Sequence, residues 1–136
     1  MNLNVLIIED DNFLSELLLR KLSGSPFHVQ RAQDGDTGLL LLEKSQPSLV
    51  LLDLMLPKKN GFEILTYMQK SPVLKYVPVI VFSNLSDNAS IERATSLGAR
   101  AYLVKSNFTL DELLEKMGEV IEGHIGPNSF FKNLTN

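Results

Sequence analysis

The chain has 136 residues, of which 44% are apolar and 21% charged, with no cysteine and a net charge of −3 at pH 7. The absence of cysteine excludes a disulfide framework, a thiolate zinc site, an iron–sulfur cluster and a cysteine nucleophile. The negative charge gives no electrostatic reason to bind nucleic acid, and no apolar run is long enough to cross a membrane. We therefore expect one acidic, cytoplasmic domain that contacts neither nucleic acid nor a membrane.

Five short apolar segments along the chain predict β-strands. In chain order they are Val5–Ile8, Phe27–Ala32, Leu49–Leu52, Val77–Phe82 and Ala101–Val104. The first, third and fourth contain continuous apolar runs rather than an alternating pattern. Strands of this kind are buried on both faces, which is typical of the centre of a parallel sheet.

The segments between these strands carry apolar residues at helical spacing, for example Leu14, Leu18 and Leu22 before the second strand. Residues that begin or stop helices flank them. The predicted boundaries are N-caps at Asp36 and Asp87, a capping box at Thr109–Glu112, and stops at Gln46-Pro47, Ser71-Pro72 and Gly123.

Strands and helices therefore alternate five times, which predicts an α/β protein with right-handed crossovers. We expect a flavodoxin-like three-layer sandwich whose five-stranded parallel sheet has the order 2-1-3-4-5. Residues 1–123 are predicted to form this single domain. Residues 124–136 lose the periodicity and are predicted to be a flexible tail.

Polar residues directly follow four of the five strands. In such sheets ligands bind beyond the carboxyl ends of the strands. Carboxylates crowd the ends of the first and third strands, which are neighbours in the expected order. Like charges so close are tolerated when a cation lies among them, and all-oxygen ligands favour a hard ion such as Mg²⁺ or Mn²⁺. The candidates are Glu9, Asp10 and Asp11 after the first strand, Asp53 after the third, Ser83 and Asn84 after the fourth, and Lys105 and Ser106 after the fifth.

Asp53 is the candidate nucleophile of this set. A carboxylate can attack phosphorus to give an acyl phosphate, and a metal ion together with Lys105 would neutralise the phosphoryl oxygens. Ser83 could donate a hydrogen bond to one of these oxygens. Each polar residue taken singly also fits a strand end that meets water. The set as a whole is what favours a phosphoryl-transfer site.

Several segments, in order and at the expected spacing, resemble the receiver domain of two-component response regulators. The resemblance extends over Asn4–Gly123 and depends on Val5–Asp11, Leu52–Gly61, Val79–Ser83 and Leu97–Lys105. It implies a phosphorylation-dependent signalling domain, similar to the single-domain chemotaxis regulators. Such a domain phosphorylates and dephosphorylates itself rather than turning over a substrate.

The resemblance also implies a metal site. Asp10 and Asp53 would bind Mg²⁺ directly, the backbone carbonyl of Met55 would be the third protein ligand, and Glu9 would hold a metal-bound water. Asp53 would in addition be the phosphorylated residue. Asp11 is interpreted as a helix N-terminal residue and not as a ligand.

A conformational switch and its partners follow from the same resemblance. Lys105 would bind the phosphoryl group, Ser83 would move to meet it, and Tyr102 would then swing inward. The surface of the fourth helix, fifth strand and fifth helix would change as a result. The implied donor is a sensor histidine kinase or a phosphotransfer protein, and the target is an unidentified protein. The domain is expected to be a monomer or a weak dimer.

The chain departs from the family pattern at four positions near the site. Ser106 stands where the family usually has proline, and Asn84 where it usually has alanine or glycine. Met55 and Leu85 flank the phosphorylation site and cannot hydrogen-bond an attacking water, which predicts a long-lived aspartyl phosphate.

Two alternative functions remain open from the sequence. One is a degenerate receiver that binds partners without being phosphorylated. The other is a phosphatase of the haloacid-dehalogenase type, which also uses an aspartate nucleophile and Mg²⁺. Such a phosphatase usually carries a second Asp two residues after the nucleophile, where this chain has Met55.

Overall fold

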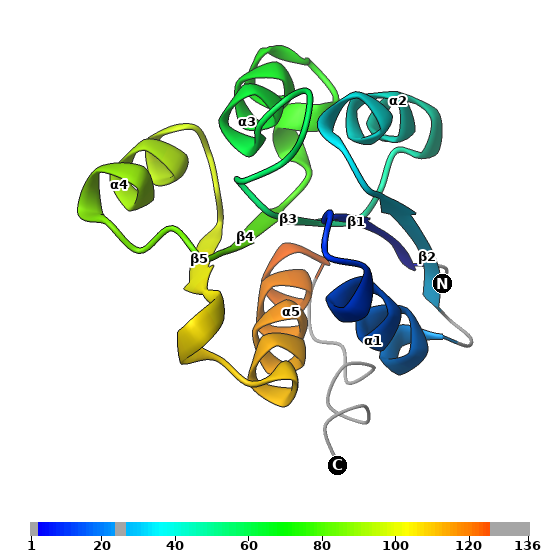
Figure 1. The fold of residues 1–136 in the computed structure, drawn as a ribbon. Coiled ribbons are helices and arrows are strands. Elements are labelled where there is room, and N and C mark those ends of the chain that lie inside the picture. Colours follow the sequence, from blue (N-terminus) through cyan, green and yellow to red (C-terminus); the bar gives the residue numbers. More distant parts are fainter. Residues whose placement is uncertain (1–2, 24–26, 126–136) are drawn as a thin grey trace.

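The computed structural model describes residues 3–23 and 27–125, in which strands and α-helices alternate as predicted (Figure 1). The strands are β1 (Leu3–Ile8), β2 (Phe27–Ala32), β3 (Leu49–Leu52), β4 (Val79–Ser83) and β5 (Ala101–Val104). The α-helices are α1 (Asn12–Leu22), α2 (Gly35–Ser45), α3 (Gly61–Lys70), α4 (Asn88–Ser96) and α5 (Leu110–Ile125). The short 3₁₀ helices η1 (Leu74–Tyr76) and η2 (Lys105–Asn107) lie before β4 and after β5.

All five strands are parallel in one sheet with the order β2-β1-β3-β4-β5, which confirms the predicted flavodoxin-like topology. Strands β1 and β3 pair from Val5↔Leu49 to Ile8↔Leu52. Because neighbouring parallel strands end at the same edge of the sheet, the residues that follow Ile8 and Leu52 lie side by side.

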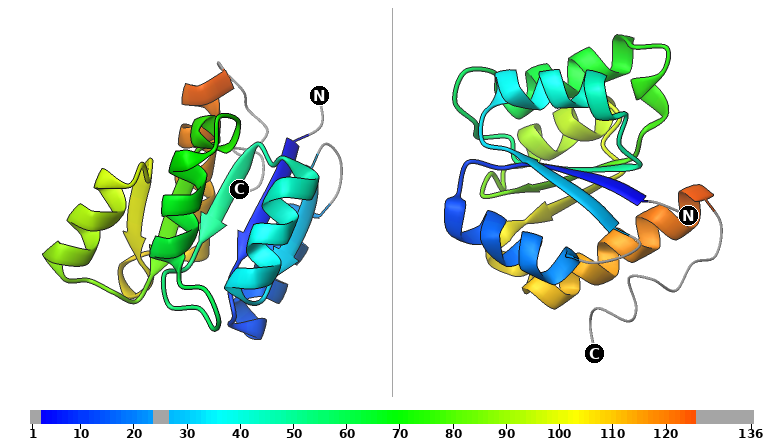
Figure 2. Two further views of the ribbon diagram at one scale, coloured as in Figure 1. Left: turned by 90° about the horizontal axis from the view of Figure 1, so that it is seen from above. Right: turned by 90° about the vertical axis from the view of Figure 1, so that its right-hand side faces the viewer.

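The sheet separates two apolar cores. Alternate residues of β1 contribute to each of them, with Val5 and Ile7 packing in the core with α1 and α5, and Leu6 and Ile8 packing with α2, α3 and α4. Figures 1 and 2 show the same arrangement of three layers. The strands read as continuous apolar runs because helices cover both of their faces.

The start of α2 differs from the prediction. Its N-cap is Asp34, whose side chain accepts the Thr37 N–H at 2.8 Å, and Asp36 lies in the first turn instead. The helix begins early because the turn after Ala32, the last residue of β2, takes only two residues. Strand β4 also differs from the prediction, since it begins two residues later, at Val79 rather than Val77.

The ends of the last two helices test three further boundaries. Asp87 caps α4 by accepting the Ser90 N–H at 3.0 Å, and the reciprocal bonds between Thr109 and Glu112 confirm the capping box of α5. Gly123 does not stop α5, because it lacks the positive φ of a left-handed cap.

Helix α5 continues to Ile125, two residues beyond the predicted domain boundary. The predicted tail from residue 126 onward lies outside the described residues. Within residues 3–23 and 27–125, none of the helices is long and apolar enough to span a membrane.

Candidate functional site

Three carboxylates meet at the carboxyl ends of β1 and β3. Glu9, Asp10 and Asp53 each place one carboxylate oxygen within 4.8 Å of the others. Glu9 and Asp53 are buried, with 3% and 5% of their surface exposed, whereas Asp10 is exposed. The register of β1 against β3 produces this cluster, because Asp53 donates its backbone N–H to the carbonyl of Ile8 at 3.0 Å.

Lys105, directly after β5, reaches this cluster. Its Nζ lies 2.8 Å from Glu9 Oε1 and 3.0 Å from Asp53 Oδ2, and its side chain is 15% exposed. The ammonium group offsets part of the negative charge that the carboxylates concentrate there. The predicted gathering of these acids and Lys105 around one place is therefore present.

Burial dominates the electrostatics of Glu9. It raises the pKa of the Glu9 carboxyl from 4.5 to about 7, with a smaller upward contribution from Asp53, while Lys105 and the Asp11 N–H oppose the shift. For Lys105, burial lowers the pKa, but the hydrogen bonds from its ammonium group to Glu9 and Asp53 outweigh it and leave the pKa raised. Lys105 is thus charged when Glu9 titrates.

The pKa of Glu9 predicts how the stability of the metal-free protein depends on pH. The unfolded chain releases this proton near pH 4.5 and the folded protein near pH 7. Glu9 therefore stabilises the folded protein most below pH 4.5, and this contribution to the free energy of unfolding is lost as the pH rises to about 7. Glu9→Gln, which cannot titrate, should lose less stability than the wild type across this window. Urea unfolding in EDTA measures both, and parallel pH profiles would contradict the prediction.

The loop between β3 and α3 begins at the cluster. The Met55 N–H donates to Asp53 Oδ1 at 3.1 Å, while the Met55 side chain is 55% exposed. Asn60 caps α3 through a capping box with Glu63, which fixes the far end of the loop. The loop thus holds the Asp53 carboxylate from one side while Lys105 holds it from the other.

Ser83 is the last residue of β4, and Tyr102 lies on the neighbouring strand β5, where it pairs with Val81. Ser83 is fully buried, and its Oγ accepts the Leu85 N–H at 3.3 Å. The Tyr102 hydroxyl donates to the Leu85 carbonyl at 2.7 Å, and the half-buried ring packs against the core under α2, α3 and α4. Burial raises the pKa of Tyr102, with smaller contributions from Asp87 and Asp53. Tyr102 therefore connects β5 to the segment between β4 and α4.

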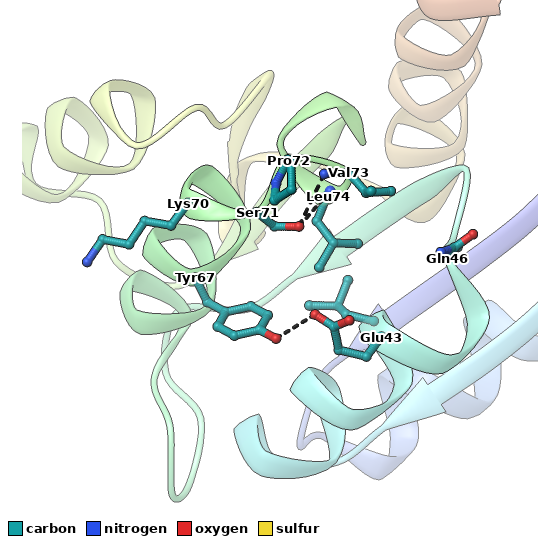
Figure 3. A pocket seen from close by; sticks show the side chains of 9 residues that line it. Glu43, Gln46, Tyr67, Lys70, Ser71, Pro72, Val73 and Leu74 are labelled. Atoms are coloured by element: carbon teal, nitrogen blue, oxygen red, sulfur yellow. Dashed lines mark hydrogen bonds between the residues drawn. The ribbon is translucent and has the colours of Figure 1, made fainter.

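A separate cavity of about 570 Å³ lies between the C-terminal ends of α2 and α3 and the loop after α3 (Figure 3). Tyr67 donates its hydroxyl proton to the Glu43 carboxylate on one side, and Ser71 Oγ accepts the Leu74 N–H on the other. These helix ends lead into the amino ends of the strands, so the cavity is at the opposite end of the sheet from the carboxylates. None of the predicted site residues lines it.

Comparisons with known proteins identify the family of the chain. The chain matches the sequence profile of the response regulator receiver domain over residues 5–118. The chain belongs to the response regulator receiver domain family. Receiver domains act in phosphorylation-dependent signalling, and this assignment does not support the haloacid-dehalogenase alternative.

Similar proteins include chemotaxis and phytochrome regulators. The chain is 33% identical to the chemotaxis protein CheV3 of Helicobacter pylori over 87% of this chain and 40% of CheV3. It is 30% identical to the probable methanogenesis regulatory protein FilR2 of Methanothrix harundinacea, over 91% of this chain and 84% of FilR2. The phosphorylated cyanobacterial phytochrome response regulator RcpA is 26% identical with a TM-score of 0.75, over 100% of this chain and 98% of RcpA. The chain spans 40 to 60% of the length of several curated relatives.

Two contributors to the receiver site were missed by the sequence analysis. The Arg31 guanidinium, near the end of β2, donates two hydrogen bonds to the Glu9 carbonyl. Gly35, the first residue of α2, donates its N–H to the Pro57 carbonyl at 3.1 Å and so holds the loop between β3 and α3. Both contacts join segments far apart in the sequence, and no local pattern signals either of them.

Proposed function

We propose that this receiver domain accepts a phosphoryl group on Asp53 from a phosphohistidine of a sensor kinase or a phosphotransfer protein. The observation that supports this most is the buried Asp53 carboxylate, 3.0 Å from the Lys105 ammonium and within 4.8 Å of two further carboxylates. An all-carboxylate cluster with one exposed member fits a hard ion that keeps several waters, as Mg²⁺ or Mn²⁺ does. Asp10, Asp53 and the Met55 carbonyl would bind this ion, and Glu9 would hold one of its waters.

The chain's own residues divide the transfer between them. An Asp53 carboxylate oxygen forms the new bond to phosphorus while the bond from phosphorus to the histidine nitrogen breaks, and the imidazole leaves with the electron pair. Lys105 is close enough to Asp53 to bond a phosphoryl oxygen in place of a carboxylate oxygen. A bound Mg²⁺ would supply further neutralisation of the negative oxygens during the transfer.

Ser83 and Tyr102 would transmit the phosphorylated state. Ser83 Oγ accepts a hydrogen bond from the Leu85 N–H, and its hydroxyl proton would be donated to a phosphoryl oxygen. A shift of Ser83 would reach Leu85 and, through the Leu85 carbonyl, the Tyr102 hydroxyl. The affected surface is formed by α4, β5 and α5, where a target protein would bind. We propose that the domain acts in the cytoplasm as a monomer or weak dimer.

Incubation with acetyl phosphate and Mg²⁺, followed by intact-mass measurement, tests this function. The wild type should gain one phosphoryl group and Asp53→Ala none. Asp36→Ala, which removes an exposed carboxylate in the first turn of α2, is the matched control and should be modified like the wild type. A folded wild-type protein that stays unmodified would favour the degenerate receiver instead.

Met55 and Leu85 stand at the two positions that flank the phosphorylation site in the family, and their apolar side chains predict a long-lived phosphoryl group. Met55→Asn and Leu85→Glu should each shorten the lifetime several-fold, because each new side chain can hydrogen-bond the attacking water. Leu85 contributes its N–H and carbonyl to Ser83 and Tyr102, and the substitution leaves this backbone unchanged. The decay of the phosphorylated protein with Mg²⁺ present measures the effect.

Leu40→Asn is the control for these variants. Leu40 lies on α2 and is 53% exposed, close to the 55% of Met55. It should leave the decay rate unchanged. Unchanged or slower decay in both Met55→Asn and Leu85→Glu would count against the role of these positions.

A further inference from the structure

Arg31 contacts the carboxylate site from β2, through the backbone rather than through a carboxylate. Its Nε and Nη2 donate to the same oxygen, the Glu9 carbonyl, at 2.9 Å and 2.8 Å. The backbone of Arg31 pairs with Ile7, two residues before Glu9, so the side chain extends along the sheet beyond the end of β1. Two donors of one planar guanidinium that converge on a single oxygen restrict the position of that oxygen more than one N–H would.

The Glu9 carbonyl lies where the hydrogen-bond ladder between β1 and β2 stops. The Glu9 N–H still donates to the Ala32 carbonyl at 3.0 Å, but Ala32 is the last residue of β2 and the chain then turns into α2. Within residues 3–23 and 27–125, no backbone N–H donates to the Glu9 carbonyl. Arg31 supplies the donors that a longer β2 would have supplied.

The Glu9 carbonyl belongs to the peptide plane that joins Glu9 to Asp10. Fixing this plane limits the directions in which both side chains leave the backbone. The Glu9 carboxylate is held separately, by the Asp11 N–H at 3.0 Å and by Lys105 at 2.8 Å. Among the described residues, no hydrogen bond or ion pair holds the carboxylate of the exposed Asp10, so its placement depends on the backbone.

We propose that Arg31 is a positioning residue for the metal site, which holds the Glu9–Asp10 peptide in the orientation that binds Mg²⁺. This inference rests on the proposed function, since it assigns how the acidic segment of that site is held. Among the described residues Arg31 forms no ion pair with the reacting carboxylate of Asp53. It would act through the backbone of the residues that bind the ion.

The direction in which Mg²⁺ affinity changes when Arg31 is removed distinguishes a positioning role from a purely electrostatic one. A guanidinium close to a cation site repels the cation, so on charge alone the removal of Arg31 would strengthen Mg²⁺ binding. A positioning role predicts the opposite, because the released peptide must be ordered again when the ion binds. Loss of a residue that holds the metal ligands without binding the metal itself commonly weakens metal affinity by about tenfold or more.

Calorimetric titration with Mg²⁺ alone, on the unphosphorylated protein, tests the proposal. Arg31→Met keeps the apolar stem but removes all donors, and should weaken Mg²⁺ binding about tenfold. Arg31→Lys keeps the charge without the bidentate geometry, and should restore part of the affinity. Arg100→Met is the matched control, since Arg100 is exposed directly before β5, at the opposite end of the sheet, and should bind Mg²⁺ like the wild type.

A second measurement keeps the test independent of the ion. Amide hydrogen exchange in EDTA should speed up at Asp11 in Arg31→Met, because a loosened Glu9–Asp10 peptide disturbs the bond from the Asp11 N–H to Glu9. It should remain as in the wild type in the central strands, which shows that the variant is folded. Unchanged or tighter Mg²⁺ binding by folded Arg31→Met would overturn the positioning role while the wild type still gains its phosphoryl group. A wild type that takes up neither Mg²⁺ nor phosphoryl would overturn the proposed function and this role with it.

Discussion

Replacing Lys105 with methionine should lower the free energy of unfolding of the metal-free protein by about 3 kcal/mol. The Lys105 ammonium contacts Glu9 at 2.8 Å and Asp53 at 3.0 Å, and both carboxylates are about 5% exposed or less. Without Lys105 they are left buried beside each other without this counter-charge. Glu9 can relieve the repulsion by taking a proton, so the loss should be smaller well below pH 7 than above it.

Lys116→Met is the control that separates the effect of burying an ion pair from the effect of the distance between its charges. Lys116 lies 2.9 Å from Glu119, as close as Lys105 is to its partners, but the side chains of this pair are 36% and 65% exposed. An exposed pair contributes at most about 1 kcal/mol, so this variant should stay close to the wild type. Urea unfolding in EDTA measures both variants. Equal losses would show that the buried cluster contributes no more than a surface ion pair.

Added Mg²⁺ should reverse part of the loss in Lys105→Met. A divalent ion among the carboxylates supplies the positive charge that the variant lacks, and it no longer competes with the ammonium for them. The free energy of unfolding should therefore rise more with Mg²⁺ in Lys105→Met than in the wild type. Phosphorylation should nevertheless be slow, because the ammonium group that bonds a phosphoryl oxygen is missing. A stability that responds equally to Mg²⁺ in both proteins would contradict the shared site.

The sequence predicted the sheet and the place of the site because both follow from local patterns. The continuous apolar runs of β1, β3 and β4 indicated burial on both faces, and the parallel order then placed the ends of β1 and β3 together. Asp53 and Lys105 were identified from their positions directly after strands. The roles that the family resemblance assigned to Met55, Ser83 and Tyr102 stay predictions.

The sequence could not predict contacts that depend on how turns fold. Two Asp residues compete to cap α2, and the short turn after β2 selects Asp34 over Asp36. The bonds from Arg31 to Glu9 require the register of β1 on β2, which no local pattern specifies. The position of the loop after β3 depends on the positive φ of Lys58, a backbone conformation that a lysine seldom adopts.

Gly35→Ala should displace the loop between β3 and α3 and destabilise the protein by about 2 kcal/mol. A Cβ at Gly35 would lie 1.9 Å from the carbonyl oxygen of Lys59 and 2.4 Å from its Cβ, so the backbone must move. That movement also strains the bond from the Gly35 N–H to Pro57 and the ion pair of Lys58 with Asp34. A shift of the loop away from α2 would relieve this clash.

Gly123→Ala is the matched control for this substitution, and its sign should be opposite. Gly123 lies in the last turn of α5, and a Cβ there would meet no atom within 4 Å apart from its chain neighbours and the backbone of its own helix. Alanine is favoured over glycine in a helix by at most about 1 kcal/mol, so this variant should be slightly more stable than the wild type. Urea unfolding compares both. Because the displaced loop begins with the Met55 N–H bond to Asp53, Gly35→Ala should also take up the phosphoryl group more slowly. A Gly35→Ala protein as stable and as reactive as the wild type would show that α2 does not hold the loop.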